Sequence, residues 1–159
     1  MRVNPKDLMI GDLVVNQNDE TLKFMGYRGD AIKVRDANGR RYLKPEEELY
    51  SIALSNAIIS QMGFRPYIQS KDRYGRYECF DLKCEGNYTV QLDHTLDMSD
   101  VEQWCIHIWH GNKSVAHGIC TEVHKLQMLM HFAGLNADAQ MLWIDDVNHT
   151  YDSEDDADD

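Results

Sequence analysis

The sequence predicts an α+β protein: a small SH3-like β-barrel, a short helix, and then an antiparallel sheet packed against one C-terminal helix. Three observations predict this class. Residues 8–53 contain short half-apolar runs separated by turn residues, as small barrels do. Residues 54–64 carry helix signals at both ends, and residues 65–144 combine two hairpin patterns with one late amphipathic helix. An open meander is the alternative to the barrel.

The expected barrel, residues 1–53, has its clearest turn at Asn38-Gly39. In the segment "AIKVRDANGRRYL", apolar and charged residues alternate, as they do in a strand with one buried face. Asn-Gly accepts positive φ at both central positions of a type I′ turn. The segment is therefore predicted to form a hairpin whose loop is these two residues.

The linking helix is expected within residues 54–64. Ser55 precedes it and can accept a hydrogen bond from the first helical turn, which is the role of an N-cap. Gly63 follows the helix and is suited to the left-handed residue that ends many helices. This helix is expected to close the first half and lead into the second.

The second half, residues 65–144, is expected to be an antiparallel sheet followed by a helix. Two strands are predicted to turn at residues 85–87, and a second hairpin is predicted around Gly111-Asn112. With this two-residue loop, Ile106 is expected to pair with His117.

Residues 145–159 form an acidic tail with eight acids and no Lys or Arg, expected to be disordered. Subtracting these eight charges from the net charge of −11 leaves −3 for the rest of the chain. The body therefore lacks the basic excess of a protein that binds a phosphate backbone. The tail is interpreted either as an aid to solubility or as a contact for a partner with a basic surface.

The chain has no apolar run near the roughly 18 residues that a membrane span requires, and no signal-peptide pattern at its N-terminus. We therefore expect a cytoplasmic location in the host cell and no membrane contact. The four cysteines form no CxxC pair, which argues against a zinc ribbon and against a thioredoxin-type motif. Most of them are expected to be buried in strands.

Four of the seven histidines, His110, His117, His124 and His131, stand seven residues apart. On a hairpin the first two are expected to lie about 13 Å apart, and on a helix the last two are expected to lie about 10.5 Å apart. Ligands of one metal ion must approach to within about 3.5 Å of each other. We therefore expect neither a metal site nor a cofactor.

The late helix is expected to begin at Thr121 and to be ended by Gly134. Its apolar arc must face the sheet, because a surface helix buries one stripe. The far side is interpreted as a candidate binding stripe, or alternatively as a solvated face. It contains His124, Gln127, Met128 and His131.

Residues 65–77 interleave cationic and aromatic side chains and are interpreted as the only basic patch of an acidic chain. Aromatic rings with cationic neighbours hold bases and nucleotides in many proteins. An ordinary exposed hairpin and a contact for the acidic tail are the alternatives. The candidate binding residues are Arg73, Tyr74, Arg76 and Tyr77.

Three segments, "LMIGDLVV", "EELYSIALSNAIISQMGF" and "VHKLQMLMHFAGL", resemble a group of small uncharacterised proteins encoded by phages and integrated elements of gut bacteria. The resemblance covers residues 6–136 in outline. Ser51 stands where the group's pattern has proline, and the acidic tail is additional. The resemblance implies a phage or prophage origin. It carries over no activity and no functional residue, because its motifs are packing and capping residues.

No GxGxxG, GxxxxGK[ST] or GxSxG motif occurs, and no catalytic residue can be assigned. We therefore expect a protein that is not an enzyme: a non-catalytic accessory protein of a phage or mobile element that docks on a host or virion protein. SH3-like barrels and sheet edges commonly serve as docking surfaces. One alternative is a nucleotide- or nucleic-acid-binding module that uses residues 65–77. Another is a small metal- or His/carboxylate-dependent hydrolase that uses residues 93–124.

Overall fold

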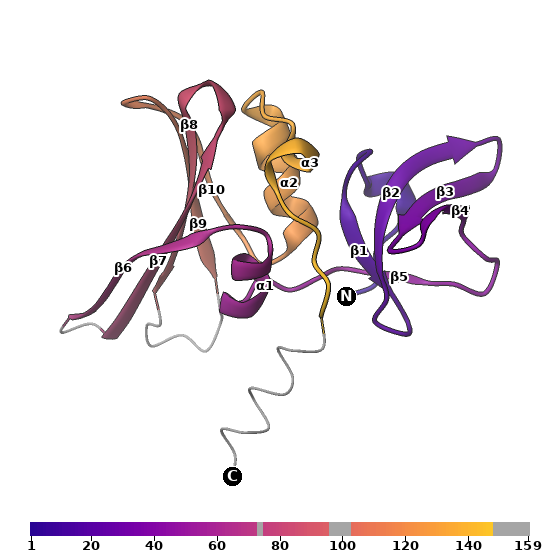
Figure 1. Ribbon diagram of the computed structural model, residues 1–159. Helices are drawn as coiled ribbons and strands as arrows, with labels where there is room; N and C mark the ends of the chain where they lie inside the picture. The colour runs from indigo at the N-terminus through magenta and orange to yellow at the C-terminus, as the bar shows by residue number, and fades with distance from the viewer. Residues whose placement is uncertain (73–74, 96–102, 148–159) are drawn as a thin grey trace, which may run out of the picture.

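The computed structural model describes residues 1–72, 75–95 and 103–147. For residues 67–72, 75–77 and 95 it describes the backbone alone. Two antiparallel sheets lie on either side of helix α2 (Val123–Phe132), as Figure 1 shows. The α+β class predicted from the sequence is confirmed. Within the described part of the chain, no helix is long and apolar enough to cross a membrane.

The first sheet has five strands in the order β4-β3-β2-β1-β5. They are β1 (Leu13–Asn16), β2 (Thr21–Arg28), β3 (Ala31–Asp36), β4 (Gly39–Tyr42) and β5 (Leu49–Tyr50), preceded by a 3-10 turn at Pro5–Asp7. Strands β1 to β4 form a meander, and β5 returns to pair with the free side of β1. Because β4 and β5 remain the two edges, the described strands form an open sheet and not a closed barrel. The SH3-like barrel is therefore not confirmed.

The predicted β3–β4 hairpin is present, but its turn lies one residue earlier than expected. Asp36 pairs with Gly39, so Ala37 and Asn38 are the loop residues. Gly39 has a φ of 137°, whereas Asn38 is not among the residues with positive φ. The Asp36 carboxylate accepts hydrogen bonds from the backbone N–H groups of Asn38 and Gly39, at 2.8 and 3.0 Å. This side-chain cap selects a turn other than type I′.

The linking helix is confirmed as α1 (Asn56–Gln61). Ser55 is its N-cap, and the Ser55 hydroxyl accepts a hydrogen bond from the Ile58 backbone N–H at 3.2 Å. Gly63 follows with a φ of 102°, in agreement with its predicted role at the helix end.

The second sheet has five strands in the order β10-β9-β8-β7-β6. They are β6 (Arg65–Asp72), β7 (Gly75–Cys84), β8 (Tyr88–Thr95), β9 (Trp104–His110) and β10 (Lys113–Cys120), with a 3-10 turn at Glu85–Asn87. The two predicted turns are confirmed, and β6 pairs with β7 as the hairpin that was one of the alternatives for residues 65–77. A bulge between Ser114 and Ala116 shifts the β9–β10 register, so that His117 pairs with His107 and not with Ile106.

One large core joins the two halves of the molecule. Leu13 and Val15 of β1 belong to the same apolar cluster as Val123, Leu126 and Met130 of α2 and the inner face of the second sheet. A second, smaller core lies on the other face of the first sheet and includes Leu8, Val14, Leu22, Phe24, Val34 and Leu49. Strand β1 is buried on both faces because it separates these two cores.

The segment after α2 packs between the two halves, and the sequence did not predict its structure. A short helix, α3 (Ala137–Gln140), is followed by an irregular stretch in which Ile144 is fully buried. The Gln61 side-chain oxygen accepts hydrogen bonds from the backbone N–H groups of Asp145 and Asp146, both at 3.0 Å. The chain is therefore held to α1 beyond residue 144. The predicted disordered tail therefore does not begin at residue 145. Residues 148–159 lie outside the described part, so their disorder stays a prediction.

Candidate functional site

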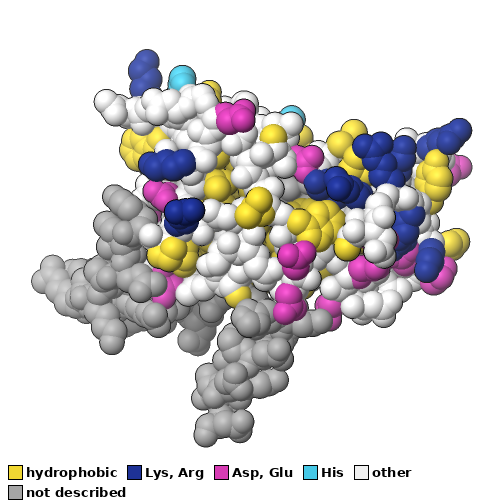
Figure 2. All heavy atoms as spheres, in the orientation of Figure 1, with side chains coloured by type: hydrophobic (Ala, Val, Ile, Leu, Met, Phe, Trp, Pro, Cys, Tyr) yellow, Lys and Arg dark blue, Asp and Glu magenta, His cyan; other side chains and the backbone are white. Residues whose placement is uncertain are grey.

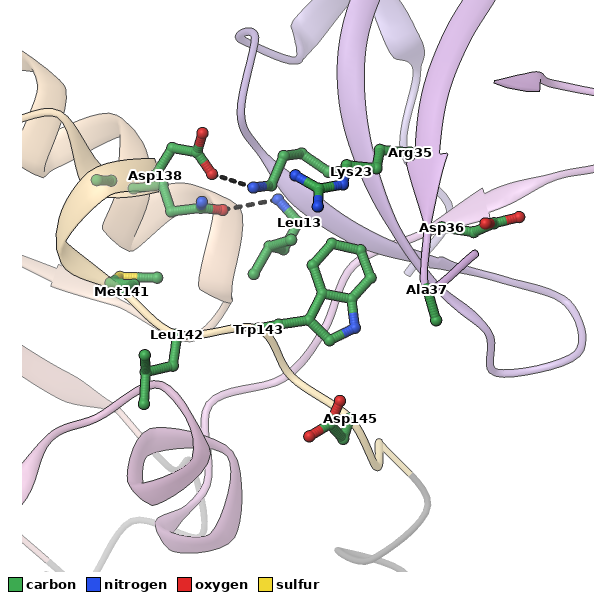
Figure 3. A pocket seen from close by; sticks show the side chains of 12 residues that line it. Leu13, Lys23, Arg35, Asp36, Ala37, Asp138, Met141, Leu142, Trp143 and Asp145 are labelled. Atoms are coloured by element: carbon green, nitrogen blue, oxygen red, sulfur yellow. Dashed lines mark hydrogen bonds and ion pairs between the residues drawn. The ribbon is translucent and has the colours of Figure 1, made fainter. Parts of the chain in front are cut away.

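A cavity of about 270 Å³ lies at the junction of the two halves. Figure 3 shows that side chains of the first sheet and of the segment after α2 point into it from opposite sides. The first sheet contributes Leu13, Lys23 and Arg35, and the later segment contributes Asp138, Trp143 and Asp145. The cavity therefore joins residues that are more than a hundred positions apart in the sequence.

Gln127 of α2 holds this junction together. Its side-chain oxygen accepts a hydrogen bond from the Leu13 backbone N–H at 2.8 Å, and its amide nitrogen donates to the Gly11 backbone oxygen at 2.9 Å. The side chain is only 4% exposed. Both polar ends of Gln127 thus satisfy backbone groups of β1 and the turn before it, which fixes the first sheet against the helix.

Lys23 of β2 is the cation deepest in the cavity, with a side chain that is 12% exposed. Its ammonium group forms an ion pair with Asp138 of α3 and lies 5.7 Å from the centre of the Trp143 ring. A buried cation is tolerated where a carboxylate and an aromatic face replace its hydration shell. Lys23 therefore belongs to the structure of the cavity wall and does not supply free positive charge.

A row of side chains extends from this wall across the first sheet. Leu13 pairs with Lys23, Lys23 with Arg35, and Arg35 with Arg40, so one face carries the row from β1 to β4. Lys33 pairs with Tyr42 on the same face, two residues along β3.

Three cations of this face are available for a ligand. Lys33, Arg35 and Arg40 make no ion pair and no side-chain hydrogen bond with any residue that the structure describes. We name the surface formed by these three residues with Tyr42 and Trp143 the cationic shelf. Figure 2 shows Lys and Arg side chains gathered over the first sheet, next to hydrophobic side chains at the junction.

Arg41, on the opposite face of the same sheet, is fully paired. Its guanidinium contacts Glu47 at 2.5 Å, Asp36 at 2.8 Å and Glu20 at 3.2 Å. The hydrogen bonds from Arg41 lower the pKa of the Glu47 carboxyl to about 2. This network compensates its own charge, so Arg41 offers little attraction to an outside ligand.

The interpretation of residues 65–77 as the only basic patch is wrong. Residues 20–44 contain seven Lys or Arg and only three acids, and the hairpin concentrates three of these cations on one face. A count of Lys and Arg against Asp and Glu along the whole chain could have found this second basic region. The side chains of Arg73, Tyr74, Arg76 and Tyr77 lie outside the described residues, so their predicted role stays a prediction.

The four residues of the candidate stripe on α2 differ in exposure. His124 and Gln127 are buried, at 5% and 4% exposed, which contradicts the expectation of an outward face. Met128 is half-buried, and only His131 is exposed. The reason is that α2 lies between two sheets, so that its second face also finds a partner (Figure 1). Burial lowers the pKa of the His124 imidazole, and Glu122 opposes that effect from 3.6 Å.

Asp12 is buried and lies between Gly11 and Leu13, the two residues whose backbone groups bond to the Gln127 side chain. It accepts a hydrogen bond from the Met9 backbone N–H at 2.9 Å. Burial raises its pKa to about 6, although the Met9 hydrogen bond and the nearby His131 act in the opposite direction. This carboxyl therefore titrates close to neutral pH at the junction of the two halves.

The histidines of the second sheet occupy two separate faces. His107 lies on the outer face, stacked on Trp109 at 4.1 Å, with its ring 6.0 Å from that of His117. His94 is buried against Trp104 at 4.4 Å, opposite Glu78 on β7. Within the described ranges, no group of three or more His, Cys, Asp or Glu side chains is placed to hold a metal ion.

Two of the four cysteines are buried, whereas the sequence predicted that most of them would be. Cys79 and Cys120 are buried, Cys84 is half-buried and Cys105 is exposed on the outer face of β9. Burial raises the pKa of Cys84 to about 11 and that of Cys120 to about 12, so both are protonated at neutral pH.

Searches against protein-family models, curated proteins and solved structures find no match for this chain.

Proposed function

We propose that this protein is a non-catalytic binding protein, an accessory protein of a phage or mobile element that docks on a host or virion protein. The observation that carries the proposal is the cationic shelf, where three cations without a described partner lie beside two partly exposed aromatic side chains. Cations without intramolecular partners, next to aromatic rings, are typical of binding surfaces. The phage origin comes from the sequence resemblance. The return of β5 to β1 is the feature that supports an SH3-like relationship for the docking half.

The partner chemistry that fits the shelf is an acidic peptide segment of another protein. Arg35 and Arg40 are cross-strand neighbours, about 5 Å apart at the backbone, and Lys33 is about 7 Å further along β3. An extended peptide repeats its side chains on one face at nearly the same interval of about 7 Å. A partner with acids at alternate positions can therefore meet these cations in sequence, while Trp143 and Tyr42 offer apolar contact.

A nucleic acid is less well matched than an acidic peptide. The chain carries a net charge of −11, and the long-range field of the protein opposes the approach of a polyanion with high charge density. Nucleotide or nucleic-acid binding through residues 65–77 remains the alternative proposal. The hydrolase alternative concerns residues 93–124, where His94 is buried and only 5% exposed.

The test is a titration of the whole protein with a fluorescently labelled Glu-rich peptide containing one aromatic residue. We expect binding at about 0.1 M salt that weakens strongly at about 1 M, because the Debye length falls from roughly 10 to 3 Å. The double variant Arg35→Glu with Arg40→Glu is expected to bind at least about tenfold more weakly, since two charge-assisted contacts become repulsive.

The matched control is Lys113→Glu with Lys125→Glu, which makes the same change in net charge on exposed positions of the other half. Equal losses in the two double variants contradict a specific role for the shelf. A single-stranded oligonucleotide of similar length serves as the second probe. Tighter binding of the oligonucleotide than of the peptide favours the nucleic-acid alternative over this proposal.

A further inference from the structure

The C-terminal residues 148–159 carry the charge that the cationic shelf lacks. Six of these twelve residues are acids, all within 152–159, and none is Lys or Arg. The shelf presents three cations on one strand pair, none with a partner among the described residues. The most acidic segment of the chain and this uncompensated basic face are therefore complementary.

The described chain ends beside β1, on the face of the first sheet that carries the shelf. Asp145 lines the same cavity as Arg35, and Val147 lines a groove beside Val15 of β1. Val15 lies on the face that carries Leu13, and Leu13 begins the row that crosses β2 and β3 to β4. Three inter-strand steps of about 4.8 Å separate Leu13 from Arg40, roughly 15 Å, and Val15 lies about 7 Å from Leu13 along β1.

Twelve residues are long enough to cover this distance. An extended chain spans up to about 3.3 Å for each residue, or roughly 40 Å from Val147. A segment tethered so close to its site has an effective concentration on the order of millimolar. An acidic ligand added at micromolar concentration is then at a disadvantage, even when its contacts with the shelf are equally good.

We propose that residues 148–159 of the same chain occupy the cationic shelf in the free protein and must be displaced when a partner docks. This proposal rests on the proposed function, because it assigns a regulating occupant to the same surface. The tail is then an internal competitor that sets a threshold for partner binding. Its carboxylates take the positions that the acids of the partner take in the complex.

The experiment is carbodiimide coupling of carboxylates to amines in the full-length protein, followed by peptide mapping. Lys33 supplies an amine on the shelf, and the variant Arg40→Lys adds a second one without changing the charge. We expect residues 152–159 to couple to Lys33 and to the amine introduced at position 40 at about 0.1 M salt, with a severalfold lower yield at about 1 M. Lys113 and Lys125 are the control amines of the other half.

Three outcomes overturn the proposal. Equal coupling to the control lysines shows unspecific contact. In the Arg40→Lys variant, absence of coupling both to Lys33 and to position 40 shows that the tail does not occupy the shelf. A coupling yield that falls on about tenfold dilution shows that the tail comes from a second copy, because only an intramolecular contact is independent of concentration.

The failure of this proposal and that of the proposed function are distinguishable. If the Glu-rich peptide binds at the shelf but the tail does not couple there, docking stands and self-occupancy is wrong. If the tail couples to the shelf, removal of residues 148–159 is expected to raise peptide affinity about tenfold or more beyond the gain seen in the Arg35→Glu, Arg40→Glu background. The same gain in both backgrounds indicates a general charge effect and overturns the competition.

Discussion

The two faces of the first sheet treat their arginines in opposite ways. Arg41 on one face contacts three carboxylates, while its neighbour Arg40 on the other face contacts none among the described residues. Both lie on β4, in consecutive positions, so their difference follows from strand alternation alone. A compensated arginine stabilises the sheet that contains it. An uncompensated one in an acidic protein is available for an outside partner, which makes the comparison a guide to function.

The largest effect is expected where the shelf face is fixed to α2. Gln127→Ala leaves the Leu13 N–H and the Gly11 carbonyl without their side-chain partner in a buried position. We expect the free energy of unfolding to fall by about 2–4 kcal/mol, measured by chemical denaturation. His131→Ala on the exposed side of the same helix is the control. A loss below about 1 kcal/mol for Gln127→Ala shows that this clamp does not hold the halves together.

Arg41→Ala removes the three ion pairs that Arg41 makes on the other face of the first sheet. This substitution leaves Glu47 without its main partner, and we expect a loss of about 1–2 kcal/mol in the free energy of unfolding near neutral pH. Glu47 has a lowered pKa of about 2, so its contribution is present above its ordinary pKa of 4.5 and disappears as the pH falls through 2. As the pH falls from 4.5 to about 2, the free energy of unfolding is therefore expected to decrease less in the Arg41→Ala variant than in the unsubstituted protein.

Arg40→Ala is the natural control for Arg41→Ala, because it removes the same group one residue away. If the two variants are equally destabilised, the two faces do not differ as the ion pairs indicate.

Asp12 makes the junction sensitive to pH. Its pKa is raised from 3.8 to about 6, so the folded protein holds a proton that the unfolded chain releases. Stability from this carboxyl is present below 3.8 and is lost as the pH rises through 6. Asp12→Asn is expected to make the melting temperature less dependent on pH between 3.8 and about 6. It is also expected to raise the free energy of unfolding at neutral pH by about 1–2 kcal/mol. A profile unchanged by the substitution contradicts the buried, proton-holding state.

The smallest effect on stability is expected on the shelf itself. Arg35→Ala removes an exposed side chain without a described partner, so the free energy of unfolding is expected to change by no more than about 0.5 kcal/mol. Binding of the Glu-rich peptide is nevertheless expected to weaken about threefold or more. A destabilised Arg35→Ala variant assigns this residue to the structure of the sheet and removes it from the docking surface.

Local features of the fold could be predicted from the sequence because neighbouring residues determine them. Ser55 caps the start of α1 through a side-chain hydrogen bond, and Gly63 ends the helix through its backbone conformation. Both effects act within one helical turn. The loop of the β9–β10 hairpin at residues 111–112 is equally local. The β3–β4 loop was misplaced by one residue because the Asp36 side chain caps the turn, a contact that competes with the preference of Asn-Gly.

The candidate site could be predicted only in part. The alternation of Lys33 and Arg35 with apolar residues indicated that both lie on one strand face, and the register of β3 with β4 then added Arg40. The aromatic wall at Trp143 was beyond prediction, because it comes from a segment more than a hundred residues later. The inward position of His124 also required the tertiary structure, since a helical wheel shows which residues share a face but not how many faces are covered.

The sequence by itself determined the α+β class, the ends of α1, the turn of the β9–β10 hairpin, and the presence of an acidic C-terminal segment. These depend on periodicity, capping residues and charge, which act over a few residues. Only the tertiary structure decided that the first sheet stays open, that α2 is covered on two sides, and that one face of β3 and β4 keeps its cations unpaired with any described residue. Those outcomes depend on which apolar faces meet to exclude water, and that choice involves residues distant in the chain.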